Sequence, residues 1–208
     1  MEDPNNLSKL PYSVSEFNMP HVLNLSYVYH LPVGHGLHWG GNMNRWADGF
    51  LGGWETTGIW TITSGQPLNL SWMSCGVTIP SYGCQQPNLI APLQKTPGSL
   101  TSNLNNYFSN ENTALSEPAP FTLGTGPPVL SSTYGPGTSN ANLAVYKNFN
   151  MGRVREGASL QVRVETINAF NHPKFANPNT TFESPNFGLI DSQLNQPRQV
   201  QLGMKLYF

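Results

Sequence analysis

The last ten residues of the chain, Gln199-Val-Gln-Leu-Gly-Met-Lys-Leu-Tyr-Phe208, decide the fold. An apolar side chain occupies every second position from Val200 to Phe208, and the positions between them are mostly polar. Successive side chains of a β-strand point to opposite faces, so this alternation predicts a strand with one apolar and one polar face.

Four further stretches show the same two-residue period, most clearly Ser159-Leu-Gln-Val-Arg-Val-Glu165. Each run is roughly 9–12 residues long, whereas strands of soluble domains have about 5–6 residues and tilted transmembrane strands about 9–11. We therefore expect an all-β protein, with an antiparallel long-stranded sheet that forms the C-terminal part of a transmembrane β-barrel. The expected strands lie near residues 20–31, 52–64, 141–150, 157–168 and 198–208, about five in an incomplete barrel.

Charge is scarce along the whole chain. The 208 residues include 10 Lys and Arg and 11 Asp and Glu, or 10% charged residues, against about 25% in an ordinary soluble domain. This composition excludes a coiled coil or a charged disordered chain, and the net charge of −1 gives no reason to expect a nucleic-acid partner. Strands that turn one face to lipid, where charge is costly, account for the deficit.

The connections between the expected strands are unequal. Two long loops, 65–140 and 169–197, fall on one side of the sheet, and the short turn 151–157 falls on the other. Outer-membrane barrels have long outer loops and short periplasmic turns, so the layout fits that class. The connection 32–53 is long for an inner turn; its segment 44–51 reads either as an amphipathic helical turn at the membrane interface or as an irregular loop, and we favour the loop.

Several short stretches occur in an order that is typical of one family. They include Val164-Glu-Thr-Ile-Asn-Ala-Phe-Asn-His-Pro-Lys-Phe175 and the closing Pro197-Arg-Gln-Val-Gln-Leu-Gly-Met-Lys-Leu-Tyr-Phe208. The others are His21–Gly34, Leu51–Pro67, Tyr146–Phe149 and Ser184–Gly188. Together they resemble the C-terminal barrel region of TonB-dependent outer-membrane receptors, specifically the Oar-like group, over nearly the whole chain.

The resemblance implies location in the cell outer membrane and uptake of a ligand too large for passive diffusion. It also implies partners: the lipid bilayer, the remainder of the barrel, a plug domain, and the barrel assembly machinery, which would read the terminal strand ending in Phe208. The chain departs from the family because it contains no plug, no TonB-contacting segment and no signal peptide. Five strands are too few for a plugged barrel of about 22, so we expect a C-terminal piece of a longer protein that meets TonB only through the missing N-terminal part.

A charged cluster is expected on the polar face of the last two strands. Pairing them antiparallel across the loop 169–197 places residue 161 opposite 205 and residue 163 opposite 203. Arg163, Glu165 and Lys205 then lie close together and face the lumen of the barrel. An Arg or Lys turned toward the bilayer midplane would instead cost about 2–4 kcal/mol.

Other candidate sites are weakly supported. His35 and His38, with His30 nearby, have a spacing that two ligands of one metal can have, but no acidic or thiol ligand accompanies them, so we expect no metal and no cofactor. Cys75 and Cys84 suit either a small loop disulfide or two free thiols. No nucleophile or phosphate-loop motif is present, so we expect no catalytic residue.

The loop 65–140 is rich in side chains that hydrogen-bond or stack on a ligand such as a sugar or a chelate. They are Trp72, Tyr82, Asn103, Asn105, Asn106, Tyr107 and Asn110. The plainer alternative, which we favour for any single residue, is a solvated loop closed over the barrel mouth. The sequence identifies neither the ligand nor its binding residues.

A second class of function fits the same alternation: a soluble extracellular β-sandwich that serves as a binding or adhesion module. The two hypotheses differ in where the apolar side chains lie. A barrel exposes them to lipid as one continuous band, whereas a sandwich buries them between two sheets. The side chains concerned are Leu160, Val162, Val164, Leu202, Met204 and Leu206.

Overall fold

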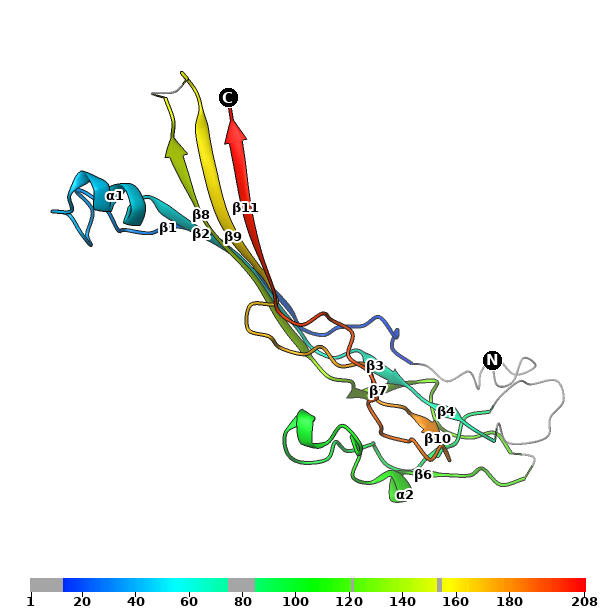
Figure 1. Ribbon diagram of the computed structural model, residues 1–208. Coiled ribbons are helices and arrows are strands. Elements are labelled where there is room, and N and C mark those ends of the chain that lie inside the picture. The colour runs from blue at the N-terminus through cyan, green and yellow to red at the C-terminus, as the bar shows by residue number, and fades with distance from the viewer. Residues whose placement is uncertain (1–12, 75–84, 121, 153–154) are drawn as a thin grey trace. The chain divides into compact units, whose positions relative to one another are not determined.

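The computed structural model describes residues 13–74, 85–120, 122–152 and 155–208 (Figure 1). Cys75, Tyr82 and Cys84 lie outside the described residues. The chain divides into two compact units. The sheet unit comprises residues 22–62, 139–173 and 196–208, and the loop unit comprises the described parts of 1–21, 63–138 and 174–195.

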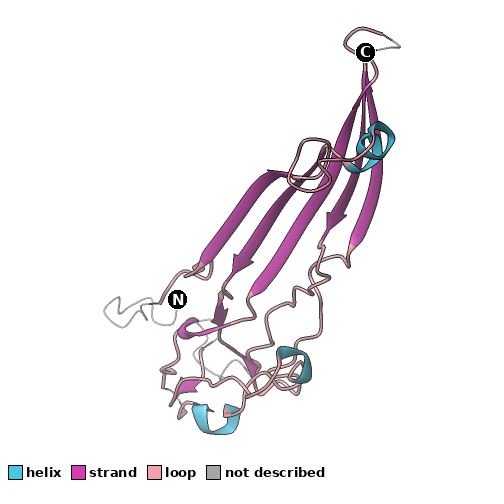
Figure 2. Ribbon diagram, turned by 90° about the vertical axis from the view of Figure 1, so that its left-hand side faces the viewer, coloured by secondary structure: helices cyan, strands magenta, loops and turns pink. Residues whose placement is uncertain are grey.

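Five long strands make up the sheet unit and run side by side in one layer (Figure 2). In the order in which they pair, the strands are β1 (Val22–His30), β2 (Trp54–Thr63), β8 (Thr138–Asn150), β9 (Ser159–Ile167) and β11 (Gln199–Tyr207). The prediction of an all-β chain with a five-stranded antiparallel sheet is confirmed. Within the described residues β1 and β11 remain the two edges, so the barrel is not closed.

The pairing register agrees with the one expected from the sequence. In the β9–β11 pair, Gly203 lies opposite Arg163 and Lys205 lies opposite Gln161. In the β1–β2 pair, the amide of Leu31 donates to the carbonyl of Trp54 at 2.9 Å, which sets the antiparallel register there.

Because directly opposite residues share a face, this register sorts the side chains of all five strands into two sets. The apolar face carries Leu23, Leu25, Tyr27, Tyr29, Trp54, Trp60, Leu143, Val145, Leu160, Val162, Val164, Val200, Leu202, Met204 and Leu206. The polar face carries Asn24, Ser26, His30, Glu55, Thr57, Thr61, Asn142, Tyr146, Asn148, Gln161, Arg163, Glu165, Gln199, Gln201 and Lys205.

In the part of the chain that the structure describes, the apolar face is exposed along β1 and β11. Leu202 is 82% exposed and Met204 is 76% exposed, although both are large hydrophobic side chains in the middle of a strand. A β-sandwich buries such residues between its two sheets, so the sandwich alternative is wrong for this chain.

The two predicted long loops are not simple solvated loops, because the loop unit has its own hydrophobic core. Ten buried side chains form this core: Leu68, Leu70, Leu93, Tyr107, Phe108, Ala114, Leu115, Leu130, Phe187 and Ile190. Phe187 and Ile190 come from the second loop and the rest from the first, so segments far apart in sequence share one core. The sequence did not predict this core, because amide and hydroxyl side chains dominate the composition of the two loops.

Short elements frame this core. They are β3 (Pro67–Asn69), β4 (Ser71–Trp72), β5 (Asn88–Leu89), η2 (Leu100–Ser102), α2 (Glu111–Ala114), β6 (Leu115–Ser116), β7 (Val129–Tyr134) and β10 (Thr181–Phe182). The pairs β3–β7 and β5–β6 are antiparallel, and β4 pairs in parallel with β10. The β4–β10 pair therefore joins the first long connection to the second.

A short helix, α1 (Arg45–Leu51), forms in the connection between β1 and β2, where we favoured an irregular loop; that expectation is wrong for these residues. The side-chain oxygen of Asn44 accepts a hydrogen bond from the amide of Ala47 at 2.8 Å and caps the helix N-terminus. Gly52 follows the last helical residue. Among the described residues, neither α1 nor α2 is long and apolar enough to cross a membrane.

Asn168 directly follows β9 and fixes the bend at the end of the strand. Its backbone is left-handed, with φ of 52°, and its side chain is buried, with 3% exposure. The side-chain nitrogen donates to the carbonyls of His172 (3.1 Å) and Gln196 (3.2 Å), and the side-chain oxygen accepts from the amide of His172 (3.0 Å). One asparagine thus joins the end of β9 to the segment that leads into β11.

Candidate functional site

One row of polar side chains crosses the polar face from β1 to β9. His30 Nδ1 lies 3.5 Å from Glu55 Oε2, and the hydroxyl of Tyr146 donates to the same carboxylate oxygen at 2.8 Å. Tyr146 in turn lies opposite Arg163 in the β8–β9 pair. Four strands therefore contribute to one hydrogen-bonded and charged row, which the sequence analysis did not identify because its members lie up to 133 residues apart.

The row continues into the predicted charge cluster, which forms in part. A terminal guanidinium nitrogen of Arg163 donates to the carboxylate of Glu165, two residues along the same face of β9. The opposite residue, Gly203, leaves room for the arginine stem, because a Cβ at Gly203 would lie 3.1 Å from Arg163 Cγ. Within the described residues Lys205 takes part in no ion pair; it lies opposite Gln161, further along the strand. Two of the three predicted charges therefore meet.

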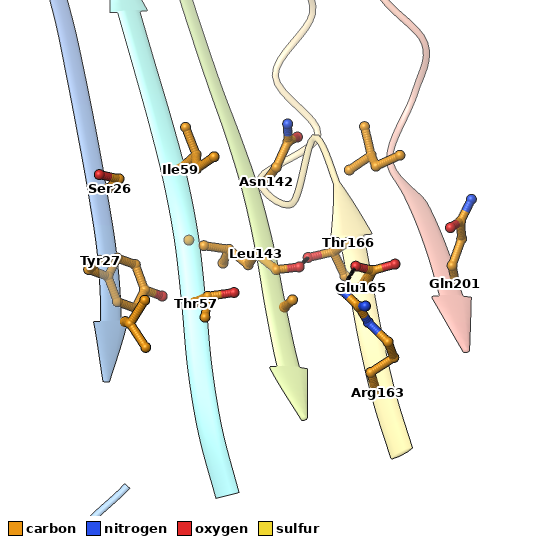
Figure 3. Close-up of a pocket in the computed structure, with 14 residues that line it drawn as sticks. Ser26, Tyr27, Thr57, Ile59, Asn142, Leu143, Arg163, Glu165, Thr166 and Gln201 are labelled. Carbon is orange, nitrogen blue, oxygen red and sulfur yellow. Dashed lines mark hydrogen bonds and ion pairs between the residues drawn. The ribbon is translucent and has the colours of Figure 1, made fainter. Parts of the chain in front are cut away.

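A hollow of about 570 Å³ lies beside this row and is lined from all five strands (Figure 3). Val28, Ile59 and Ile167 give it apolar surface, and polar groups stand between them. The polar groups include Ser26, Thr57, Asn142, Arg163, Glu165 and Gln201. This mixture of aliphatic, amide and charged groups fits an occupant with both apolar surface and hydrogen-bonding groups.

The histidines that the sequence singled out as possible metal ligands each contact a different partner. His30 lies beside Glu55 in the polar row. The backbone amide of His35 donates to Asp48 Oδ1 at 2.6 Å, and the ring of His38 packs 6.1 Å from that of Trp39. Among the described residues, no three His, Cys, Asp or Glu side chains gather in a way that could hold a metal ion.

Several residues of the first long loop that the sequence offered as candidates for ligand contact hold the loop unit together instead. The hydroxyl of Tyr107 donates to the carbonyl of Tyr134 at 3.0 Å, and burial raises the pKa of Tyr107 to about 12. Asn103 donates to the carbonyls of Thr96 and Pro97, at 3.0 and 3.1 Å. Trp72 and Tyr107 are buried, Asn110 bonds to the backbone of residues 92 and 94, and Asn105 and Asn106 are exposed.

An acidic pair lies on the loop unit and was also missed by the sequence analysis. A hydrogen bond with Glu183 raises the pKa of Glu117, while the pKa of Glu183 is lowered, first by that bond and then by hydrogen bonding from Ser74. Glu183 has a left-handed backbone, with φ of 64°. No sequence signal links these carboxyls, because they come from the two different long connections.

The polar row gives a first prediction. Replacing Tyr146 by phenylalanine removes a hydrogen bond to a carboxylate, and we expect the free energy of unfolding to fall by about 1 kcal/mol. Tyr27→Phe is the matched control, because its hydroxyl lies 3.4 Å from that of Thr56, at the outer limit of a hydrogen bond, and we expect a smaller loss. Urea titrations followed by tryptophan fluorescence measure both. Equal losses in the two variants would show that the row adds nothing to stability.

Comparison with known families identifies the barrel class. The family model described as an outer membrane beta barrel domain matches residues 1–201. No curated protein and no solved structure matches the chain.

Proposed function

Because the chain belongs to the outer membrane β-barrel domain family, we propose that it forms part of the wall of a TonB-dependent receptor that takes up a ligand. Family membership places the protein in the outer membrane. The observation that carries the proposal is the sheet itself, whose long strands separate an exposed apolar face from a polar face with a charged row and a hollow.

In this proposal the apolar face contacts lipid and the polar face lines the lumen. Arg163 and Glu165 must then face the lumen, where charged groups contact water or each other. On the lipid face the same charges would be costly. Backbone groups at the edges of β1 and β11 must also be paired within hydrocarbon, so strands from the remainder of the barrel are the natural neighbours of both edges.

The remaining partners follow the same scheme. The hollow on the polar face offers a surface for a plug domain or a passing ligand, and the loop unit, formed from the two long connections, contacts ligand at the outer surface. The barrel assembly machinery recognises β11, which precedes the 80% exposed Phe208. TonB acts through an N-terminal part, and the proposal assigns the protein no enzymatic activity.

Cross-linking to TonB tests the receptor proposal without knowledge of the ligand. The full-length gene product, expressed in cells of its own species and treated with formaldehyde, is expected in the outer-membrane fraction with a TonB adduct that disappears in cells lacking TonB. The same lysates probed for an established TonB-dependent receptor provide the positive control. Outer-membrane location without a TonB adduct would agree with a barrel protein but contradict the TonB-dependent mechanism.

A further inference from the structure

Helix α1 exposes two large aromatic side chains that the barrel wall does not use. Trp46 is 82% exposed and Phe50 is 70% exposed, and their four-residue spacing puts both on one side of the helix. Leu37, Trp39 and Leu51 of the same connection are also exposed hydrophobic residues. A helix of 7 residues is not stable alone in water, so this one must be held by contacts with its surroundings.

Those contacts fix α1 as a defined element. Besides the Asn44 cap, the carboxylate of Asp48 accepts the amide of His35 at 2.6 Å, so the helix is bound to the turn before it. Glycine is required around that carboxylate, because a Cβ at Gly34 would lie 2.8 Å from Asp48 Oδ1 and a Cβ at Gly52 would lie closer still. Trp46 and Phe50 are therefore presented by a packed helix.

Two side chains of the apolar face bind the end of α1. Trp54 Nε1 donates to the carbonyl of Phe50 at 2.9 Å. Lys147 Nζ donates to the carbonyls of Gly52 and, at 3.3 Å, of Asp48. Lys147 breaks the apolar alternation of β8, yet it is only 5% exposed, and its ammonium lies 5.1 Å from the ring centre of Phe149 on the same face. The end of α1 is thus attached to the apolar side of the sheet.

The position of α1 relative to the ends of the strands is also defined. α1 follows the end of β1 and precedes the start of β2, as Figure 1 shows, which is the end of the antiparallel sheet that also carries the turn between β8 and β9. Short turns mark the periplasmic side of an outer-membrane barrel. Helix α1 therefore lies at the periplasmic end of the strands, with its last residues attached to the apolar side of the sheet.

We propose that α1 is an interfacial anchor that lies in the periplasmic leaflet of the outer membrane, with Trp46 and Phe50 among phospholipid headgroups and the adjoining acyl chains. Lipid is the occupant that fits, because Trp54 and Lys147 attach the helix to the apolar face, and tryptophan is enriched at headgroup level. The exposed Arg45 beside Trp46 supplies a cation for phosphate, and Lys147 acts as the positioning residue that attaches the helix. The inference rests on the lipid-facing orientation proposed above.

Quenching by brominated phospholipids tests the anchor in the full-length protein reconstituted in vesicles. We expect wild type to lose more tryptophan fluorescence than Trp46→Phe, and we expect this difference to be at least twofold larger with bromine near the headgroup than at the acyl-chain end. Trp72→Phe is the control, because Trp72 is a buried residue of the loop unit whose removal should not change the amount of fluorescence that lipid bromine quenches. Lys147→Met keeps the aliphatic stem but removes the donor, and should at least halve the Trp46 contribution, whereas Lys147→Arg should retain it.

The orientation of the sheet is tested in the same vesicles by Leu202→Trp. The new tryptophan should add fluorescence that is quenched by bromine at the acyl-chain end of the lipid. If Leu202→Trp is quenched while Trp46 is quenched only by iodide in the aqueous phase, the anchor is wrong and the barrel orientation stands. Protection of Trp46 from both quenchers would indicate a protein contact and would also overturn the anchor. If neither Trp46 nor the new tryptophan meets lipid, the proposed orientation itself fails.

Discussion

Replacing Asn168 by alanine is expected to lower the free energy of unfolding by about 3–5 kcal/mol, the largest effect of any single change considered for this protein. Two costs combine. Alanine in a left-handed conformation costs about 1–2 kcal/mol. The three partly buried hydrogen bonds between the Asn168 side chain and the backbone of residues 172 and 196 are also lost, and each contributes about 0.5–1.5 kcal/mol. Guanidinium unfolding of the full-length protein in phospholipid vesicles measures the loss.

Asn171→Ala is the matched control, because Asn171 is also left-handed, with φ of 54°, but is exposed. Its side-chain oxygen accepts one hydrogen bond, from the amide of Arg198 at 3.0 Å. We expect a loss no larger than about 2 kcal/mol, mostly from backbone conformation. If the two alanine variants lost equal stability, the side-chain bonds of Asn168 would contribute nothing, and the fixed bend after β9 would need another cause.

Replacing Leu202 by arginine should have the second largest effect. Leu202 lies near the middle of β11, opposite Val164 on the apolar face, so an arginine there would place a charge in the hydrocarbon of the bilayer. Near the midplane this costs about 2–4 kcal/mol. We expect the folded fraction in vesicles, measured by the heat-dependent shift in electrophoretic mobility, to fall accordingly.

Gln201, the residue before Leu202, provides the control for the Leu202→Arg variant. Gln201 lies on the polar face opposite Glu165, so Gln201→Arg places the same charge one residue away but in the lumen, beside a carboxylate. Its expected effect is within about 0.5 kcal/mol of wild type. A large loss from Gln201→Arg together with a small loss from Leu202→Arg would reverse the two faces and contradict the proposed orientation.

The long strands could be predicted because a two-residue period is local information. From Val200 to Phe208 every second residue is apolar, and the β9–β11 register followed from pairing the two strands antiparallel across the loop 169–197. Lys147 was the informative exception. It places a charge at an apolar position of β8, and the structure explains the residue by its bonds to the end of α1.

The core of the loop unit could not be predicted in the same way. Its members occupy segments without regular period, and the contact between Phe108 and Phe187, with ring centres 5.4 Å apart, joins residues 79 positions apart in the chain. Such packing depends on how the two long connections meet, which no local pattern records. The same holds for Tyr107 and Asn103, whose polar groups look available for a ligand in sequence but satisfy backbone groups in the structure.

The sequence by itself therefore determined the class of protein: long two-faced strands, sparse charge, and the register of the last pair, all consequences of a backbone whose side chains alternate between two environments. Only the tertiary structure decided where the polar groups meet. The His30–Glu55–Tyr146 contacts, the Asn168 bonds and the attachment of α1 by Lys147 each join segments distant in sequence. The pairing order of the strands and the need to satisfy buried polar groups select the partners in these contacts. No single stretch of the sequence determines either of these two factors.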